Sequence, residues 1–223
     1  MPFRLAQFQS LARQTQPESA ALVHGRHRND PQRELYAVVS LTRLKPAQFP
    51  QYEYLLVQVD PLLLCQRDNG RAEQLRTATG DFDDYNLFSL LIDHSCGKCK
   101  FGPGSFLGLE QSLQGYGLGS YMLSRLIRYG QEHYPQFAIS PEHLDTRDSG
   151  FDPGCIEAFC QQLNFEVVFR SEQELTCLVK RMELLQASDA TGRIREVEAE
   201  LPTELIFPSI ERDQIIRRIS SCA

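Results

Sequence analysis

The sequence predicts an α/β fold in which a mixed β-sheet is flanked by helices and followed by a partly helical C-terminal extension. Strand-like runs follow one another in the first half of the chain without a long helix between them, which favours an antiparallel meander. The hydrophobic pattern then changes to a helical period over residues 117–131. A second amphipathic helix and two more strand-like runs come after it, so helices and strands are expected to share one core.

The first half of the chain carries most of the predicted strands. The N-terminal residues, up to about residue 30, are predicted to form one or two short helices that end in a polar stretch at 24–33. Residues 66–86 are predicted to be a polar loop with an acidic tip and a helical turn around 71–76. Runs rich in β-branched and aromatic residues predict strands at 35–41, 54–59, 87–92 and 105–109, the last reached through a turn at 95–104.

In the second half, helices and strands alternate. Apolar side chains recur at helical spacing over residues 117–131, which predicts the first long helix. A second helix is predicted to begin with Asp152 as its N-cap and Pro153 in its first turn, and to end near Asn164, a residue that tolerates the left-handed conformation. Strands are predicted within residues 137–146, 165–169 and 175–179.

The texture of the sequence changes after Met182. A charged helix is predicted over residues 193–200, and a narrow apolar stripe follows further on. We therefore predict one domain over residues 1–182 and an extension over residues 183–223. This stripe is too narrow to stabilise a helix on its own, so we expect it to dock on the same chain or across a homodimer. Its residues are Ile215, Ile216 and Ile219.

Composition limits the classes of function. The chain has 223 residues and a formal net charge of −6, so no global basic field attracts nucleic acid or an anionic membrane. No apolar run approaches the length of about 18 residues that a membrane span requires. The seven cysteines are an odd number and suggest free thiols in a reducing cytoplasm. We expect a cytoplasmic protein that binds neither nucleic acid nor membrane.

A glycine-rich turn leads directly into the first long helix. Gly115, Gly117 and Gly119 let a phosphate approach backbone N–H groups that are unpaired at a helix start, where the helix dipole also favours an anion. The Gly-Lys-Ser/Thr of a Walker loop is absent, and the spacing does not fit the dinucleotide fingerprint. The turn predicts a phosphate or pyrophosphate ligand; the alternative is a turn that only tightens a strand–helix junction.

Two segments resemble the GNAT superfamily of N-acetyltransferases. Gln114-x-x-Gly117-x-Gly119 resembles its Q/R-x-x-G-x-G/A pyrophosphate loop. Residues 159–165, Phe-Cys-Gln-Gln-Leu-Asn-Phe, resemble its F-Y-x-x-x-G-F segment, and residues 144–147 resemble its fifth strand. The matches extend over about a third of the chain. Cys160 stands where the family often has a Tyr that protonates the leaving thiolate, and Asn164 stands where it has Gly.

The resemblance implies an acetyl-CoA-dependent N-acetyltransferase that transfers an acetyl group directly to a primary amine of a small molecule or peptide. N-terminal strands would span residues 34–109 and an acetyl-CoA core residues 105–180. The strand at 107–111 would splay from its neighbour and offer backbone groups to the pantetheine arm. Residues 115–120 would hold the pyrophosphate through N–H groups. The implied cofactor-binding residues are Leu109, Gln111, Gln114, Gly115, Tyr116, Gly117, Leu118, Gly119 and Ser120.

Two residues are candidates for proton transfer. Glu110 on the implied pantetheine strand could be the general base, or a carboxylate that faces solvent. Cys160 could be the acid, or a small apolar residue in a helix face. His143 and Asp145 near the splayed strand could orient water or substrate. If neither proton donor nor base is present, the alternative is a catalytically weak or inactive GNAT-fold module that binds CoA or a protein.

Cys96-Gly97-Lys98-Cys99 is a C-x-x-C motif that could also belong to a zinc or redox site. Zinc would need two further ligands at a matching spacing, and no second C-x-x-C exists in the chain. A redox pair would stand at a helix N-terminus, whereas this motif is predicted in a hairpin turn. We therefore predict a plain turn and no metal. The acidic tip at 81–84 could attract a cationic amine or could simply be solvated.

Overall fold

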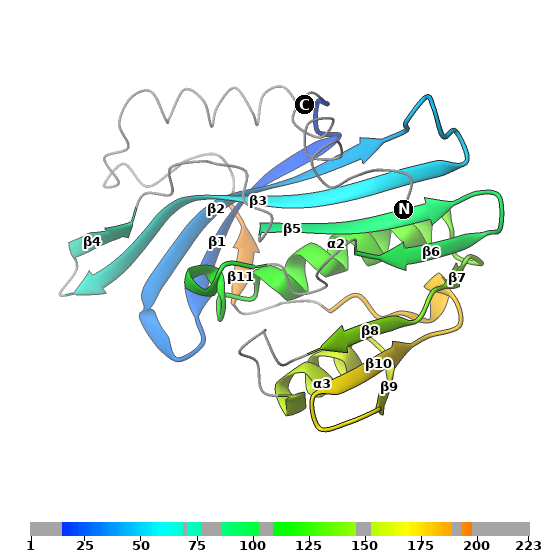
Figure 1. Ribbon diagram of the computed structural model, residues 1–223. Helices are drawn as coiled ribbons and strands as arrows, with labels where there is room; N and C mark the ends of the chain where they lie inside the picture. The colour runs from blue at the N-terminus through cyan, green and yellow to red at the C-terminus, as the bar shows by residue number, and fades with distance from the viewer. Residues whose placement is uncertain are drawn as a thin grey trace.

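The computed structural model describes residues 15–68, 71–76, 86–102, 109–145, 153–188 and 193–197 (Figure 1). Within these ranges the larger sheet has eight strands in the order β11-β1-β2-β3-β5-β6-β7, with β4 paired to β3 beside this path. The smaller sheet has three strands in the order β8-β10-β9. The predicted α/β class with a mixed sheet is confirmed, and strands dominate it, because only two α-helices lie among the described residues.

An antiparallel meander forms the larger part of the main sheet, as the sequence predicts. The predicted strands at 35–41, 54–59 and 87–92 all lie within longer observed strands. Each strand pairs with the next in the meander, and β2 and β3 stay paired from Leu44 and Tyr54 at one end to Arg33 and Gln66 at the other. The strands are β1 (Ser19–His27), β2 (Asp30–Leu44), β3 (Tyr52–Asp68), β5 (Leu87–Asp93) and β6 (Lys98–Phe101).

Two strands occupy segments where helical structure was predicted. Residues 19–27 form β1 instead of the end of an N-terminal helix. Successive side chains of a strand point to opposite faces, yet Leu22 and Val23 are both buried, so β1 lacks the alternation that would reveal a strand. β4 (Arg71–Arg76) replaces the predicted helical turn, because the long strand β3 offers it a ladder of backbone partners that outweighs its local propensity.

Two further predictions are wrong at the edges of the main sheet. The strand after β5 is β6, which lies within the segment predicted as a turn at 95–104. Of the residues predicted as a strand at 105–109, the structure describes only Leu109, which lies outside any strand. In β6, two exposed lysines alternate with buried Cys99 and Phe101, which is the pattern of a strand. The pattern is only four residues long and overlaps the C-x-x-C motif, so the segment was predicted as a turn. Instead of a charged helix at 193–200, β11 (Ile194–Glu196) pairs with the outer edge of β1.

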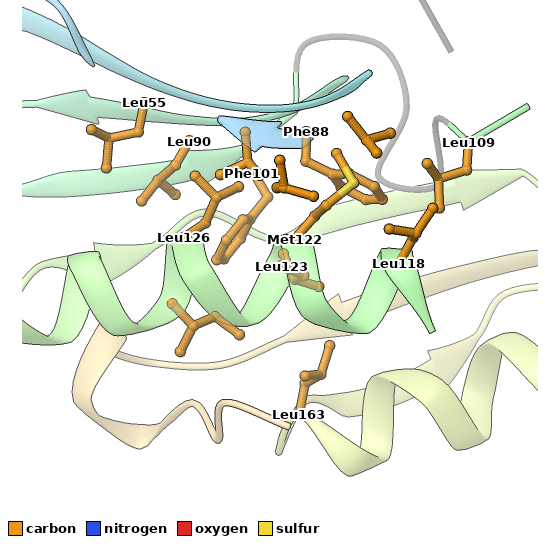
Figure 2. Packing of buried hydrophobic residues seen from close by; sticks show 14 of the residues in the cluster. Leu55, Phe88, Leu90, Phe101, Leu109, Leu118, Met122, Leu123, Leu126 and Leu163 are labelled. Carbon is orange, nitrogen blue, oxygen red and sulfur yellow. The ribbon is translucent and has the colours of Figure 1, made fainter. Parts of the chain in front are cut away.

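The helix α2 (Leu118–His133) confirms the predicted helical segment and covers one face of the main sheet. Figure 2 shows Leu118 and Met122 of α2 directed toward Phe88 and Leu109, while Leu163 lies on the other side of the helix. Burial of each such side chain contributes about 1.5–3 kcal/mol relative to exposure, so this stripe fixes α2 on the sheet. The buried residues of α2 are Leu118, Met122, Leu123, Ser124, Leu126, Ile127 and Gly130.

A buried carboxylate ties the C-terminal end of α2 to the sheet. Glu53 on β3 accepts hydrogen bonds from Arg43 Nε at 2.8 Å and Nη2 at 3.1 Å. The hydroxyl of Tyr134, the C-cap residue of α2, lies 3.1 Å from both carboxylate oxygens. Lys45 and His94 approach the same carboxylate, each with a nitrogen 3.4 Å from Oε2. Residues of β2 and β3, the residues that follow β2 and β5, and the C-cap of α2 thus meet at a single negative charge.

The crossover through α2 joins two parallel strands. β6 pairs with β7 (Ala138–Ile139) through only two residue pairs, Lys98 with Ala138 and Cys99 with Ile139. The chain then passes Pro141 and enters β8 (Glu142–Asp145), which belongs to the smaller sheet and pairs with β10. The single strand predicted within 137–146 is therefore two short strands in two sheets.

The smaller sheet and α3 follow the predicted order. α3 (Pro153–Gln162) begins at the predicted proline, whereas Asp152 lies outside the described residues. Asn164 has φ 65° and takes the left-handed conformation predicted for it. The predicted strands at 165–169 and 175–179 correspond to β9 (Glu166–Phe169) and β10 (Glu174–Leu178).

Residues beyond Met182 also belong to this architecture. Leu185 after the short 3₁₀ helix Met182–Leu184 is part of the main apolar core, and so is Ile194 of β11. The sheet therefore reaches into the segment predicted as an extension. The apolar stripe of residues 215–219 lies outside the described residues. Within the described ranges, neither α2 nor α3 combines the length and apolarity needed to cross a membrane.

The first expected result concerns β11. A chain that ends at residue 191 should have a free energy of unfolding lower by about 2–4 kcal/mol than one that ends at residue 197, because it loses the buried side chain of Ile194 and the ladder on β1. Urea unfolding and light scattering of the two chains measure the difference. Equal unfolding midpoints would show that β11 adds no stability to the edge of the sheet.

Candidate functional site

The candidate site lies at the carboxyl ends of β6 and β7, where α2 begins. These two strands run parallel, and the helix that connects them returns antiparallel to both, so its N-terminus stands at their carboxyl ends. In α/β folds, ligands bind at this end of the strands, in the crevice outside the sheet. The glycine turn of residues 115–117 leads into this helix N-terminus.

Left-handed glycines shape the turn before α2. Gly115 has φ 85°, and Gly117, the N-cap, has φ 88°. The first intrahelical hydrogen bond runs from Tyr121 N–H to the Gly117 carbonyl at 3.0 Å. The amides of Leu118, Gly119 and Ser120 therefore precede the intrahelical ladder, and no side chain makes a capping hydrogen bond at Gly117. An anion at this position would meet several N–H groups and the positive end of the helix dipole.

The β1–β2 hairpin holds the glycine turn in place. Arg28 N–H donates a hydrogen bond to the Gly115 carbonyl at 3.0 Å. A Cβ atom on Gly115 would lie 2.5 Å from His27 Nε2, so a larger residue would have to displace the His27 ring and adopt a positive φ that favours glycine. Tyr116 is fully buried and its ring meets that of His27 edge to face. The Tyr116 side chain is therefore part of the core, whereas the resemblance assigns the N–H groups of residues 115–120, and not this ring, to the pyrophosphate.

The predicted pantetheine strand at 107–111 is wrong for the residues that the structure describes. Leu109 and Glu110 lie outside any strand, and Gln111 begins the 3₁₀ helix Gln111–Leu113. Gln114 Nε2 donates a hydrogen bond to the Leu109 carbonyl at 3.2 Å, so its side chain closes this turn from within. The Leu109 side chain packs against the start of α2, 3.5 Å from the Cβ position of Gly119. The buried apolar side chain of Leu109 made this turn resemble a strand in the sequence.

Local hydrogen bonds hold Glu110. Its N–H donates to Asn86 Oδ1 at 3.1 Å, and its Oε1 accepts a hydrogen bond from Ser112 Oγ at 2.9 Å. The side chain is half-buried. These contacts join the turn before α2 to the start of β5. They give Glu110 a structural role and engage one of the oxygens that a general base would use.

Cys160 is fully buried in α3, and its Sγ lies 3.2 Å from Sγ of Cys177 on β10. The shared hydrogen bond with Cys177 and burial raise the pKa of Cys160. A thiol in this environment keeps its proton and packs as a small apolar residue. The contact favours the packing interpretation of Cys160 over the role of proton donor.

The other candidates lie on elements other than the glycine turn. His143 on β8 is exposed, and its Nδ1 lies 2.9 Å from Thr176 Oγ1 on β10. Asp145, also exposed, ends β8. Cys96 is exposed in the turn between β5 and β6, whereas Cys99 is buried in β6. In the described part of the chain, no three His, Cys, Asp or Glu side chains gather in a way that could hold a metal ion. The acidic tip at 81–84 lies outside the described residues.

Sequence reasoning missed Glu142, the first residue of β8. It stands where the chain leaves the parallel pair, and its side chain is buried although it is a carboxyl group. The available signal was its position: Glu142 directly follows Pro141, which separates β7 from β8. Because the strand was predicted as one continuous element, no break at this position directed attention to it.

No protein-family model matches this chain, and a search of curated proteins gives no significant match.

Proposed function

We propose that this protein is an N-acetyltransferase that uses acetyl-CoA and transfers the acetyl group directly to a primary amine of a small molecule or peptide. One observation carries the proposal. An uncapped helix N-terminus follows two left-handed glycines and stands at the carboxyl ends of a parallel strand pair whose strands part after two residue pairs. The GNAT resemblance implies two splayed strands with a glycine loop and a helix between them.

The chemistry of the turn suits the phosphate end of CoA. The amides of Leu118, Gly119 and Ser120 are the groups that would hold a pyrophosphate, and Gly117 keeps side-chain atoms away from it. β6 belongs to the main sheet, whereas β8, which begins after residue 140, belongs to the smaller sheet. The backbone groups of β6 and β8 at the point where the sheets part are therefore candidates to hydrogen-bond the amides of the pantetheine arm. The thioester would then lie where the two strands part.

The alternative is a module of the same fold that binds CoA or a protein and catalyses little or no transfer. The burial of Cys160 against Cys177 favours this alternative, because the family position for the acid holds a thiol that keeps its proton. Thiol release from acetyl-CoA in the presence of amines separates the two functions. A module without activity would bind the nucleotide and release no thiol above the blank.

The second expected result tests ligand binding. Acetyl-CoA at about 100 times its Kd should stabilise the native state by about 2.7 kcal/mol through mass action. For a chain of this length, that corresponds to an increase in Tm of about 5–10 °C. Thermal melts with acetyl-CoA and with S-acetylpantetheine, which lacks the phosphates, measure the effect and its origin. An unchanged Tm at millimolar acetyl-CoA would contradict the proposal, and an equal shift with both compounds would contradict the phosphate role of the turn.

A further inference from the structure

The carboxyl group of Glu142 bridges the two sheets at the point where they part. The parallel ladder ends with the hydrogen bond from Ser140 N–H to the Cys99 carbonyl at 2.8 Å. Two residues further along each strand, the Glu142 carboxylate accepts a hydrogen bond from the backbone N–H of Phe101. A side chain thus occupies the place that a strand backbone would have taken. Glu142 therefore stands at the carboxyl ends of β6 and β7, the end of the sheet at which α2 begins.

One oxygen of this carboxyl group is unused. Glu142 is 8% exposed, and its Oε1 atom is buried and has no hydrogen-bond partner among the described residues. Leaving a buried polar atom without a partner costs about 1–3 kcal/mol, so such atoms are often kept for a ligand or a reaction. The Phe101 N–H interacts with the same carboxyl group, while Oε1 itself has no hydrogen-bond partner among the described residues.

The surroundings of Glu142 suit a proton acceptor. The charged and titratable groups described around it are Lys100 on β6 and the Cys177 thiol on β10, its cross-strand partner. Burial raises the pKa of Glu142 to about 7, although the charge of Lys100 and the hydrogen bond from Phe101 N–H act to lower it. A base with a pKa near the working pH is both largely ionised and able to accept a proton effectively. No other carboxyl group of the described residues combines burial, an unused oxygen and this position.

We propose that Glu142 is the general base of the acetyl transfer, accepting a proton on Oε1 from the incoming amine where β6 and β8 part. This inference rests on the proposed function and assigns the base to a residue other than Glu110. The carboxylate takes one proton from the ammonium group and leaves a neutral amine. The nitrogen lone pair then forms the bond to the acetyl carbon.

The remaining electrons and protons balance within the same reaction. The tetrahedral adduct collapses as the C–S bond breaks, and its electron pair stays on the sulfur of CoA. The second proton of the nitrogen passes to that thiolate, so the products are the amide and the free thiol. Glu142 then releases its proton to solvent and is ready for the next amine.

The test compares Glu142→Gln with wild type and with Glu110→Gln in the full chain. In the Glu142→Gln variant the amide oxygen of the new side chain can still accept the hydrogen bond from Phe101 N–H, so the fold is kept while proton uptake is lost. Turnover is followed as thiol release from acetyl-CoA with spermidine, glucosamine and a tripeptide with a free N-terminus as acceptors. Acetyl-CoA affinity is measured separately by calorimetry, and kcat is followed from pH 5.5 to about 9, a range that brackets the general-base titration.

We expect Glu142→Gln to lower kcat at least about 100-fold with the Kd of acetyl-CoA changed less than about twofold. The wild-type kcat should rise with pH and level off near the pKa of Glu142, and the variant should lack this dependence. Glu110→Gln should keep the wild-type pH profile and a kcat within about threefold. Wild-type turnover that survives Glu142→Gln would overturn the assignment, and so would turnover lost only in Glu110→Gln.

A second measurement does not depend on the acceptor. Because burial raises the pKa of Glu142 in the folded state, the wild type should lose stability relative to Glu142→Gln as the pH rises from about 4.5 to about 7. Parallel stability curves for the two proteins would overturn the proposal. If none of the three amines supports turnover in the wild type, the assignment also fails, whereas stabilisation by acetyl-CoA would still support the binding part of the proposed function.

Discussion

Glu53→Ala is expected to lower the free energy of unfolding by about 3–5 kcal/mol, the range for removing one partner of a buried ion pair. The Glu53 side chain is 1% exposed, and without it the Arg43 guanidinium and the Tyr134 hydroxyl lose their shared acceptor. The C-terminal end of α2 loses its attachment to the sheet at the same time. Urea unfolding followed by circular dichroism measures the change.

Glu18→Ala is the matched control. Glu18 pairs with the same arginine, Nη1 to Oε1 at 3.8 Å, but its side chain is 41% exposed. Exposed ion pairs contribute about 0–1 kcal/mol, so this variant should unfold close to wild type. Similar losses in both variants would mean that the burial of Glu53 does not set the strength of the cluster.

The same cluster gives stability a defined pH dependence. Burial alone would raise the pKa of Glu53, but the hydrogen bonds and charge of Arg43, helped by Tyr134 and Lys45, hold it below its usual value. The ionised carboxylate therefore stabilises the fold fully above about pH 4.5, and this stabilisation is lost as the pH falls through the lower folded-state pKa. In Glu53→Gln this part of the acid-induced loss of stability should be absent.

Gly117→Asp is expected to weaken acetyl-CoA binding strongly without weakening the fold. Asp and Asn both tolerate a positive φ and both can cap a helix, so the pair Gly117→Asp and Gly117→Asn differs mainly in charge. A carboxylate at this position favours the α2 dipole, yet it repels a pyrophosphate at the same amides. We expect the Asp variant to bind acetyl-CoA about 2 kcal/mol, or roughly 30-fold, more weakly than the Asn variant.

Calorimetric titration of both variants with acetyl-CoA, together with their melting curves, separates charge from backbone effects. In the absence of acetyl-CoA, the Asp variant should have a Tm at least equal to that of the Asn variant. Equal affinity in the two variants would place the phosphates of the ligand away from the N-terminus of α2. A Tm of both variants well below that of the wild type would show that Gly117 is needed for the fold itself.

The sequence predicts the elements whose hydrophobic pattern is set by one buried face. α2 is an example, because its apolar side chains from Leu118 to Ile127 recur at helical spacing and are buried. β1 was missed because both of its faces are buried, so the pattern of Leu22 and Val23 carries no period of two. β11 is three residues long and exists only through pairing with β1, which no local pattern encodes.

The candidate site was partly predictable for a related reason. Glycines that take positive φ angles before a helix are visible in the sequence, and Gly115 and Gly117 have these angles. The roles of Glu110 and Glu142 depend on tertiary contacts with Asn86 and Phe101, far away in the sequence. A half-buried and a nine-tenths-buried carboxylate look the same in a sequence, so the choice between them required the fold.

The pairing of β11 with β1 has a consequence for the newly synthesised chain. Gly25 lies near the beginning of the described chain and its partner Ile194 near the end. On the ribosome, where the N-terminal part emerges first, the outer edge of β1 remains an open row of backbone donors and acceptors until almost all other strands have been made. Such an edge can recruit a strand from a neighbouring polypeptide. Arg26, exposed at the end of β1, places a charge on this edge and makes pairing with another nascent chain less favourable during that interval.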